Sequence, residues 1–223
     1  MQSLPAPNAV TCVLVDDHQM VVEALVGMLQ QTRRIRVVGT AGSADKAVQV
    51  VAQHQPHVIV SEIKLPGRIL FDVAPELLER SPGSRILILS NYLADIFIAR
   101  ALKQNLAGYL MKSDTFAELT AAIERVAAGE RVYSRAVSER MVVDPATNLP
   151  ALRHESELAS LTSRQLEVLR YLACGQSVKE IAKVMHLSQK SVDSHKYRIM
   201  NKLGIHDRVL LARFAIREGL MVP

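Results

Sequence analysis

Aromatic residues and cysteines are scarce in this sequence. It has no tryptophan, four phenylalanines, five tyrosines and two cysteines among its 223 residues. With so few aromatic rings, any buried core must consist largely of aliphatic side chains. Cys12 and Cys174 lie far apart, each inside an apolar pattern. We therefore expect two buried free thiols in a reducing compartment, and neither a disulfide nor a metal-binding pair.

Long apolar runs are also missing. No stretch of about 18 uncharged apolar residues could form a membrane-spanning helix. Residues 1–9 lack the basic start and apolar core of a secretory signal. The sequence has no glycine-rich phosphate loop, no metal-ligand set of histidines and cysteines, and no nucleophile–base pair. We therefore expect a cytoplasmic protein that does not associate with membranes and is not an enzyme.

The positive charge is concentrated in the last part of the chain. From Ala159 to Pro223, 11 Lys and Arg stand against 5 Asp and Glu, whereas the first 158 residues carry 16 basic and 17 acidic side chains. A near-neutral front and a basic back indicate that the back half binds a polyanion, such as double-stranded DNA. General surface solubility is the alternative explanation of this charge.

The front part alternates short β-rich apolar runs with helical patterns. This alternation is typical of a parallel sheet covered on both faces, because right-handed crossovers place helices on either side. We predict an N-terminal tail at residues 1–10, followed at residues 11–130 by an α/β doubly wound five-stranded parallel sheet. The strands are expected at Thr11–Val15, Arg36–Thr40, His57–Ser61, Arg85–Ser90 and Gly108–Leu110.

The back part follows a different pattern. Residues 131–160 carry prolines, mixed charge and no sustained period, and are predicted to be a linker with a short helix. Residues 161–223 are predicted to be an all-α domain. Thr162 and Gln165 form a capping-box pattern at its first helix, and Ser188 is placed to cap a longer helix that Gly204 ends. A shorter helix joined to that longer one by a brief turn is the helix-turn-helix arrangement.

Acidic, hydroxyl and amino side chains fall at the ends of the predicted strands. Asp16 and Asp17 follow the first strand, Glu62 follows the third, Ser90 ends the fourth and Lys112 follows the fifth. Because ligands of doubly wound sheets bind at the carboxyl ends of the strands, we expect these side chains to face one crevice. Three carboxylates together suit a cation, so Asp16, Asp17 and Glu62 form a candidate Mg²⁺ site. The alternative is that each carboxylate simply caps a helix.

The same residues resemble the receiver domain of two-component response regulators, over about residues 11–129. "VLVDDH" resembles the acidic pair of that family, "ILILS" its Ser/Thr at Ser90, and "GYLMK" its lysine at Lys112 with the aromatic switch residue at Tyr109. The resemblance implies a flavodoxin-like fold. In that family, the third strand ends with an aspartate that accepts a phosphoryl group from a histidine kinase, beside a bound Mg²⁺.

The phosphoacceptor position of this chain holds Glu62 in place of aspartate. A glutamate carries its carboxylate about 1.5 Å farther out, and a shift of that size can slow in-line phosphoryl transfer by roughly a hundredfold. The longer acid instead places negative charge near Ser90 and Lys112, where phosphoryl oxygens would lie, and Lys64 could replace Mg²⁺ as a cation. We therefore predict an atypical receiver that ordinary aspartyl phosphorylation by a histidine kinase does not control.

Alternatives to this prediction stay open. Glu62 could simply abolish switching. The chain could also be a standard phosphorylation-switched regulator in which Glu62 is weakly active, or in which it was introduced as a phosphate mimic. In a third alternative, the receiver acts mainly as a protein-interaction module and DNA binding is secondary.

The longer helix of the back part has an apolar and a polar face. Val192, Ile199 and Leu203 are spaced to face the core, whereas Tyr197 and Asn201 lie where a helix in the major groove meets base edges. Lysines and arginines at its flanks are better placed for phosphates. The side chains predicted to contact DNA are Lys190, Ser191, Asp193, Ser194, Lys196, Tyr197, Arg198, Asn201 and Lys202. The alternative is an ordinary solvated basic helix.

Residues 161–219 resemble the LuxR-type helix-turn-helix of the NarL/FixJ family. The shared pattern comprises Glu167, the Gly175 stop, the Ile181–Ala182 pair and "SQKSVDSH" at the start of the recognition helix. The resemblance implies a DNA-binding transcription regulator with a receiver in front. Because one such module makes a small interface with DNA, we expect a homodimer on two half-sites. The candidate dimer surfaces are helix 115–128 and the stripe Val209, Ala212, Phe214 and Ala215.

Overall fold

The computed structural model describes residues 9–66, 68–144, 149–153, 157–218 and 220. Most of the predicted tail, residues 1–8, therefore lies outside the described residues, as do residues 221–223. The chain divides into two compact units, residues 1–91 with 100–139 and residues 92–99 with 140–223. Among the described residues, none of the helices combines the length and the hydropathy that crossing a membrane requires.

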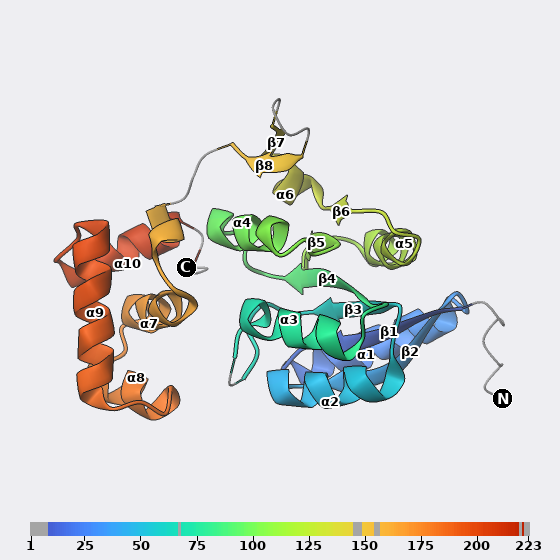
Figure 1. Ribbon diagram of the computed structural model, residues 1–223, viewed down its shortest axis with the longest axis horizontal. Helices are drawn as coiled ribbons and strands as arrows, with labels where there is room; N and C mark the ends of the chain where they lie inside the picture. The colour runs from blue at the N-terminus through green and yellow to red at the C-terminus, as the bar shows by residue number, and fades with distance from the viewer. Residues whose placement is uncertain (1–8, 67, 145–148, 154–156, 219, 221–223) are drawn as a thin grey trace. The chain divides into compact units, whose positions relative to one another are not determined.

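The first unit is built on a parallel sheet with the strand order β2–β1–β3–β4–β5–β6 (Figure 1). This order reverses direction once, as in doubly wound folds, so the predicted α/β architecture is confirmed. The strands are β1 Val10–Val15, β2 Ile35–Ala41, β3 Val58–Ser61, β4 Arg85–Ser90, β5 Gly108–Met111 and β6 Val132–Tyr133.

The prediction of five strands was wrong by one. β6 pairs in parallel with β5, Val132 opposite Gly108 and Tyr133 opposite Tyr109. Two residues are too few to show an alternating apolar pattern, so sequence reasoning placed them in the linker. A side chain at position 108 would interfere with this pairing, because a Cβ there would lie 2.4 Å from the Val132 carbonyl oxygen.

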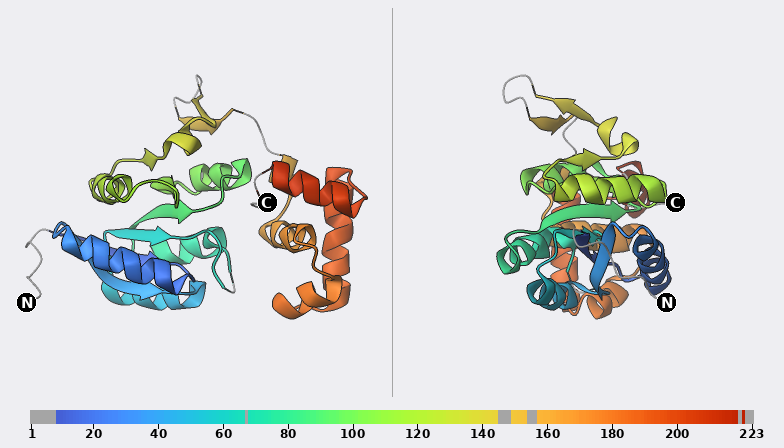
Figure 2. Two further views of the ribbon diagram at one scale, coloured as in Figure 1. Left: turned by 180° about the vertical axis from the view of Figure 1, so that it is seen from behind. Right: turned by 90° about the vertical axis from the view of Figure 1, so that its right-hand side faces the viewer.

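Helices cover both faces of this sheet, α1 and α5 on one face and α2 and α3 on the other (Figure 2). Local capping sets where two of them begin: the hydroxyls of Ser43 and Thr115 each accept a backbone N–H three residues on. The helices are α1 Gln19–Gln31, α2 Ala44–His54, α3 Leu70–Arg80, α4 Asp95–Lys103 and α5 Phe116–Ala127.

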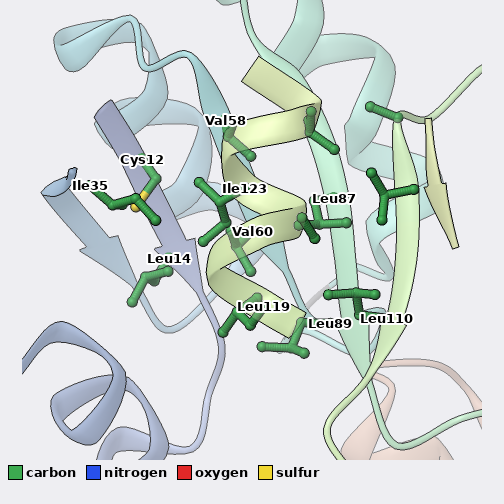
Figure 3. Close-up of a cluster of buried hydrophobic side chains, with 14 of the residues drawn as sticks. Cys12, Leu14, Ile35, Val58, Val60, Leu87, Leu89, Leu110, Leu119 and Ile123 are labelled. Carbon is green, nitrogen blue, oxygen red and sulfur yellow. The ribbon is translucent and has the colours of Figure 1, made fainter. Parts of the chain in front are cut away.

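An aliphatic core lies between the sheet and α5 (Figure 3). Leu119 and Ile123 of α5 point onto strand side chains such as Val60 and Leu89. Alternate strand residues face the opposite side and are buried as well. Cys12 belongs to this core, and burial raises the pKa of its thiol to about 12.

The predicted linker, residues 131–160, holds more regular structure than its composition indicated. After β6 come the expected short helix, α6 (Arg135–Ser138), an antiparallel hairpin of β7 (Met141–Val143) and β8 (Pro150–Leu152), and a 3₁₀ helix, η1 (Glu157–Ser160). Residues 145–148 and 154–156 of this segment lie outside the described residues.

The second unit contains the predicted helix-turn-helix. Its helices are α7 Ser163–Ala173, α8 Val178–Val184, α9 Gln189–Leu203 and α10 Arg208–Arg217. The capping box of Thr162 with Gln165 is present, Ser188 caps α9, and Gly204 ends α9 in the left-handed conformation. Cys174 was wrongly expected to be buried: it is exposed, because it is the C-cap of α7 at the surface.

Candidate functional site

The three predicted carboxylates lie at the carboxyl ends of β1 and β3. These strands are neighbours, with Val15 opposite Ser61, so the residues that follow them meet at one edge of the sheet. Asp16 and Glu62 are buried, 8% and 4% exposed, whereas Asp17 is exposed. The structure thus brings the carboxylates together but places only two of them in the interior.

The carboxylate of Glu62 is held from two sides. Its Oε1 accepts a short hydrogen bond from the Ser90 hydroxyl, at the end of β4, and another from the Ile63 backbone N–H at 2.6 Å. Its Oε2 lies 2.9 Å from Nζ of Lys112. Both oxygens of this buried acid therefore have partners, and two of those partners are the side chains that sequence reasoning assigned to the same crevice.

Lys112 joins the two buried acids. Its Nζ lies 2.5 Å from Oδ2 of Asp16 as well as 2.9 Å from Glu62, and its side chain is only 11% exposed. Burial by itself would lower the pKa of Lys112, but the hydrogen bonds and charges of Asp16 and Glu62 outweigh it and raise that pKa above its usual value. The ammonium is therefore a stable internal counter-charge.

His18 completes the cluster and was missed by the sequence analysis. Its Nδ1 lies 3.0 Å from Oδ1 of Asp16 and 3.1 Å from Oδ1 of Asp17, and its backbone N–H donates to the same Asp16 oxygen. The available signal was its position directly after the acidic pair, in "DDH". Tyr109, the predicted switch residue, lies in β5 and its side chain is completely buried.

A bound Mg²⁺ would have to compete with Lys112 for the two buried carboxylates. Such an ion would need open oxygen ligands from the carboxylates. All four carboxylate oxygens of Asp16 and Glu62 already accept hydrogen bonds or ion pairs from protein groups. Asp16, Asp17 and His18 do place one ligand atom each within 4.8 Å of one another, with His18 bonded to both acids. The site therefore presents a buried anion whose positive partner is Lys112.

Helix α9 presents the predicted DNA-contacting face to solvent. Val192 and Ile199 are buried, Leu203 is half-buried, and Tyr197 is 68% exposed. Other predicted DNA contacts with exposed side chains are Lys190, Asp193, Ser194, Arg198, Asn201 and Lys202, whereas Lys196 is half-buried.

Three predicted or neighbouring side chains of α9 are engaged within the domain. The Ser191 hydroxyl pairs with the Ser188 hydroxyl at 2.8 Å, as part of the helix cap. Nζ of Lys202 donates to the Ser160 carbonyl and to the side-chain oxygen of Gln165. His195 is half-buried, and burial, with the charges of Arg164 and Arg198, lowers its pKa.

The apolar stripe on α10 divides between core and surface. Phe214 and Ala215 are buried, Ala212 is half-buried, and Val209 is 67% exposed. Leu210, beside it, is 54% exposed. Half of the predicted stripe is therefore ordinary core packing, and the other end lies at the surface.

Both halves of the chain match known families. The model described as "Response regulator receiver domain" matches residues 12–124, and "Bacterial regulatory proteins, luxR family" matches residues 159–215. A probable transcriptional regulatory protein NarL of Mycobacterium tuberculosis is 30% identical over 219 residues, 98% of this chain and 99% of the relative. Response regulator UvrY of Escherichia coli is 29% identical over 211 residues, 95% of each chain.

A solved structure of the RcsB response regulator of Salmonella typhimurium has the same fold. It aligns with a TM-score of 0.70 and 22% identity over 95% of this chain and 99% of that one. At this identity the likeness bears on the fold alone.

Proposed function

Since this chain belongs to the NarL/FixJ family of response regulators, DNA-binding transcription regulators that join a receiver to a LuxR-type helix-turn-helix, we propose that Glu62 makes its receiver independent of ordinary aspartyl phosphorylation. The observation that carries the proposal is the bonding of Glu62 to both Ser90 and Lys112. The Glu62 carboxylate already bonds Ser90 and Lys112, the two side chains that an added phosphoryl group would bind. The receiver is then held in one state by its own sequence.

Phosphoryl acceptance at Glu62 would have to break these contacts. The carboxylate would leave a hydroxyl, a backbone N–H and an ammonium in a buried site. It would also have to reach a donor from a position about 1.5 Å beyond that of an aspartate. Because transfer depends on ångström-level alignment, both effects oppose the reaction. We therefore expect no histidine kinase to control this receiver through Glu62.

We also infer that the receiver does not need Mg²⁺. Lys112 lies between Asp16 and Glu62, with its raised pKa keeping it charged at neutral pH. Three carboxylates without a cation would repel one another, and the ammonium reduces that repulsion. His18 lies between Asp16 and Asp17, with its Nδ1 within 3.1 Å of an oxygen of each.

For the DNA-binding domain we propose that α9 enters the major groove. Tyr197 and Asn201 are exposed and would reach base edges, while Lys190, Lys196 and Arg198 would contact phosphates. Asp193 and Ser194 lie on the same exposed side. The Asp193 carboxylate would accept a hydrogen bond from the amino group of cytosine, or it would repel nearby phosphates. Either effect would discriminate between DNA sequences.

We propose that the active form is a homodimer on two half-sites, since a single helix-turn-helix buries little DNA surface. The exposed end of α10, Val209 with Leu210, supports that helix as one candidate contact. A cytoplasmic location also stays a prediction.

The proposal can be tested with genomic fragments that the protein itself selects. Their affinity is measured with and without Mg²⁺ and acetyl phosphate, a small phosphodonor, at two salt concentrations. Tight, salt-sensitive binding that ignores the donor supports a receiver uncoupled from phosphate. Stronger binding with the donor would mean that Glu62 or a neighbour accepts the phosphoryl group. Weak, salt-insensitive binding would favour a protein-interaction module instead.

A further inference from the structure

We propose that Lys202 is a positioning residue: it holds the recognition helix α9 against the start of α7 and does not act as a DNA phosphate contact. The inference rests on the proposed use of α9 to bind DNA. From its sequence position alone, Lys202 resembles the other basic side chains of α9. Its contacts distinguish it from them.

Lys202 directs its ammonium into its own domain. It is the second-to-last residue of α9, and its Nζ lies 2.5 Å from the Ser160 carbonyl oxygen and 3.1 Å from Oε1 of Gln165. An ammonium has three N–H donors, so two of them are used within the chain. Lys202 is exposed, as is Arg198 one turn earlier, so the two hydrogen bonds of its ammonium are what set it apart.

Other contacts within the domain hold the hydrogen-bond acceptors of Lys202 in place. Gln165 is 4% exposed, and the same Oε1 accepts the Thr162 backbone N–H at 3.0 Å as half of the capping box of α7. Ser160 ends η1, two residues before Thr162 of that capping box. Lys202 therefore ties the last turn of α9 to the point where the preceding segment enters α7.

This tie controls the direction of the recognition helix. Val192 and Ile199 pack one side of α9 into the core, and Lys202 adds a polar anchor near its C-terminal end. A binding surface must hold its side chains within about 0.5 Å of their working positions. Loss of the anchor would let α9 tilt. The base contacts of Tyr197 and Asn201 would then weaken, whereas the sequence-independent electrostatic affinity for DNA would stay nearly the same.

The salt dependence of DNA binding separates a positioning residue from a phosphate contact. The full chain is titrated with a 30-bp duplex of arbitrary sequence at a series of salt concentrations, as wild type, Lys202→Gln and Arg198→Gln. Each phosphate contact contributes about 0.9 to the slope of log K against log salt. We expect Arg198→Gln to reduce the slope by about that amount and Lys202→Gln to leave it unchanged.

Specific binding gives the second readout. On a genomic fragment selected by the wild type, Lys202→Gln is expected to lose about tenfold in affinity, the size of effect that misplaced base contacts produce, while its affinity for the arbitrary duplex stays the same. Gln165→Leu keeps the charge of Lys202 but removes its buried acceptor. We expect it to cause the same loss of specificity, and the double variant to be no worse than either single variant.

Thermal unfolding gives the third readout. We expect Lys202→Gln to lower the Tm of the helix-turn-helix unit by about 4–8 °C, as the loss of one net hydrogen-bonded contact does in a small domain. A slope reduced by about 0.9 would overturn the proposal whatever the Tm. So would an unchanged Tm with unchanged specificity. If the wild type shows no salt-dependent binding at all, the proposed DNA-binding role of α9 fails, and the Tm comparison still reports the anchor.

Discussion

The ammonium of Lys112 lies 2.9 Å from the carboxylate of Glu62, and their side chains are only 11% and 4% exposed. A buried charge is tolerated when it is paired and hydrogen-bonded, and both conditions hold for Glu62. The pair thus links the position that corresponds to the phosphoacceptor of receiver domains with the position that corresponds to their lysine.

An aspartate at position 62 should let the receiver accept a phosphoryl group and should make DNA affinity depend on a phosphodonor. In Glu62→Asp the shorter acid can attack the phosphorus of acetyl phosphate, and acetate leaves. We expect intact-protein mass spectrometry with Mg²⁺ to detect one added phosphoryl group in the variant and none in the wild type. DNA affinity of the variant should then rise roughly tenfold with the donor, a coupling of ordinary size. Glu62→Gln, which keeps the length without the charge, should accept no phosphoryl group. Phosphorylation of Glu62 in the wild type would contradict the proposal.

Removing the internal cation should destabilise the receiver. Lys112→Met leaves Asp16 and Glu62 buried without their shared partner, at a cost of roughly 3 kcal/mol in the free energy of unfolding. Urea denaturation measures this cost. Lys103→Met, an exposed lysine of α4, is the control and should cost less than about 0.5 kcal/mol.

The pH dependence of the same contribution has a definite sign. Because the pKa of Lys112 is raised above 10.5, its contribution is fully present below that pH and is lost only as pH rises through the raised value. Equal stability of Lys112→Met and wild type at neutral pH would show that the ion pairs do not matter.

Magnesium should not stabilise the wild type. The oxygens of Asp16 and Glu62 are already bonded. We therefore expect about 10 mM MgCl₂ to change the free energy of unfolding of the wild type by less than about 0.3 kcal/mol. In Glu62→Asp the shorter carboxylate no longer reaches Lys112, so its oxygens are free to bind Mg²⁺. With a Kd of about 1 mM, the same addition would stabilise that variant by about 1.4 kcal/mol. Sodium chloride at matched ionic strength controls for salt effects. A similar gain in the wild type would mean that the ion displaces Lys112.

The fold could be predicted from the sequence because its signals are local and repeated. Five strands with continuous apolar runs and the caps of α7 and α9 were each marked by several residues. β6 was missed because two residues carry no period, and its partner Gly108 lies far away in the chain.

The sequence predicts which side chains meet at the site but not which of them pair with one another. The strand ends indicated which side chains meet, because parallel strands end at one edge. Sequence could not show that Lys112 bridges Asp16 and Glu62, or that Lys202 turns toward Gln165. Such pairings depend on side-chain directions that no spacing encodes.

A side chain at Gly108 should weaken the sixth strand. In Gly108→Ala the new Cβ would lie 2.4 Å from the Val132 carbonyl oxygen and 2.7 Å from Cδ1 of Leu87. We expect a loss of about 1–3 kcal/mol, the usual cost of overpacking. Gly83→Ala is the control, because its Cβ would meet nothing within 4 Å. Hydrogen exchange of the Val132 N–H, which donates to the Ala107 carbonyl, should accelerate only in Gly108→Ala. Equal exchange in both variants would show that β6 does not depend on this close approach.

His195 should make the DNA-binding domain less stable in mild acid. Burial, Arg164 and Arg198 lower its pKa below the usual 6.5, and its Nδ1 is buried without a hydrogen-bond partner among the described residues. In the unfolded chain this histidine therefore takes up a proton at a higher pH than in the folded chain. Its stabilising contribution is fully present above pH 6.5 and is lost as pH falls through the lowered pKa. Urea unfolding from about pH 7.5 to 5.5, a range set by about one unit either side of the histidine pKa, should show this decline in the wild type and in His206→Gln. His195→Gln cannot take up the proton, so its decline must be smaller; an identical decline would mean that His195 is as accessible to protons in the folded domain as in the unfolded chain.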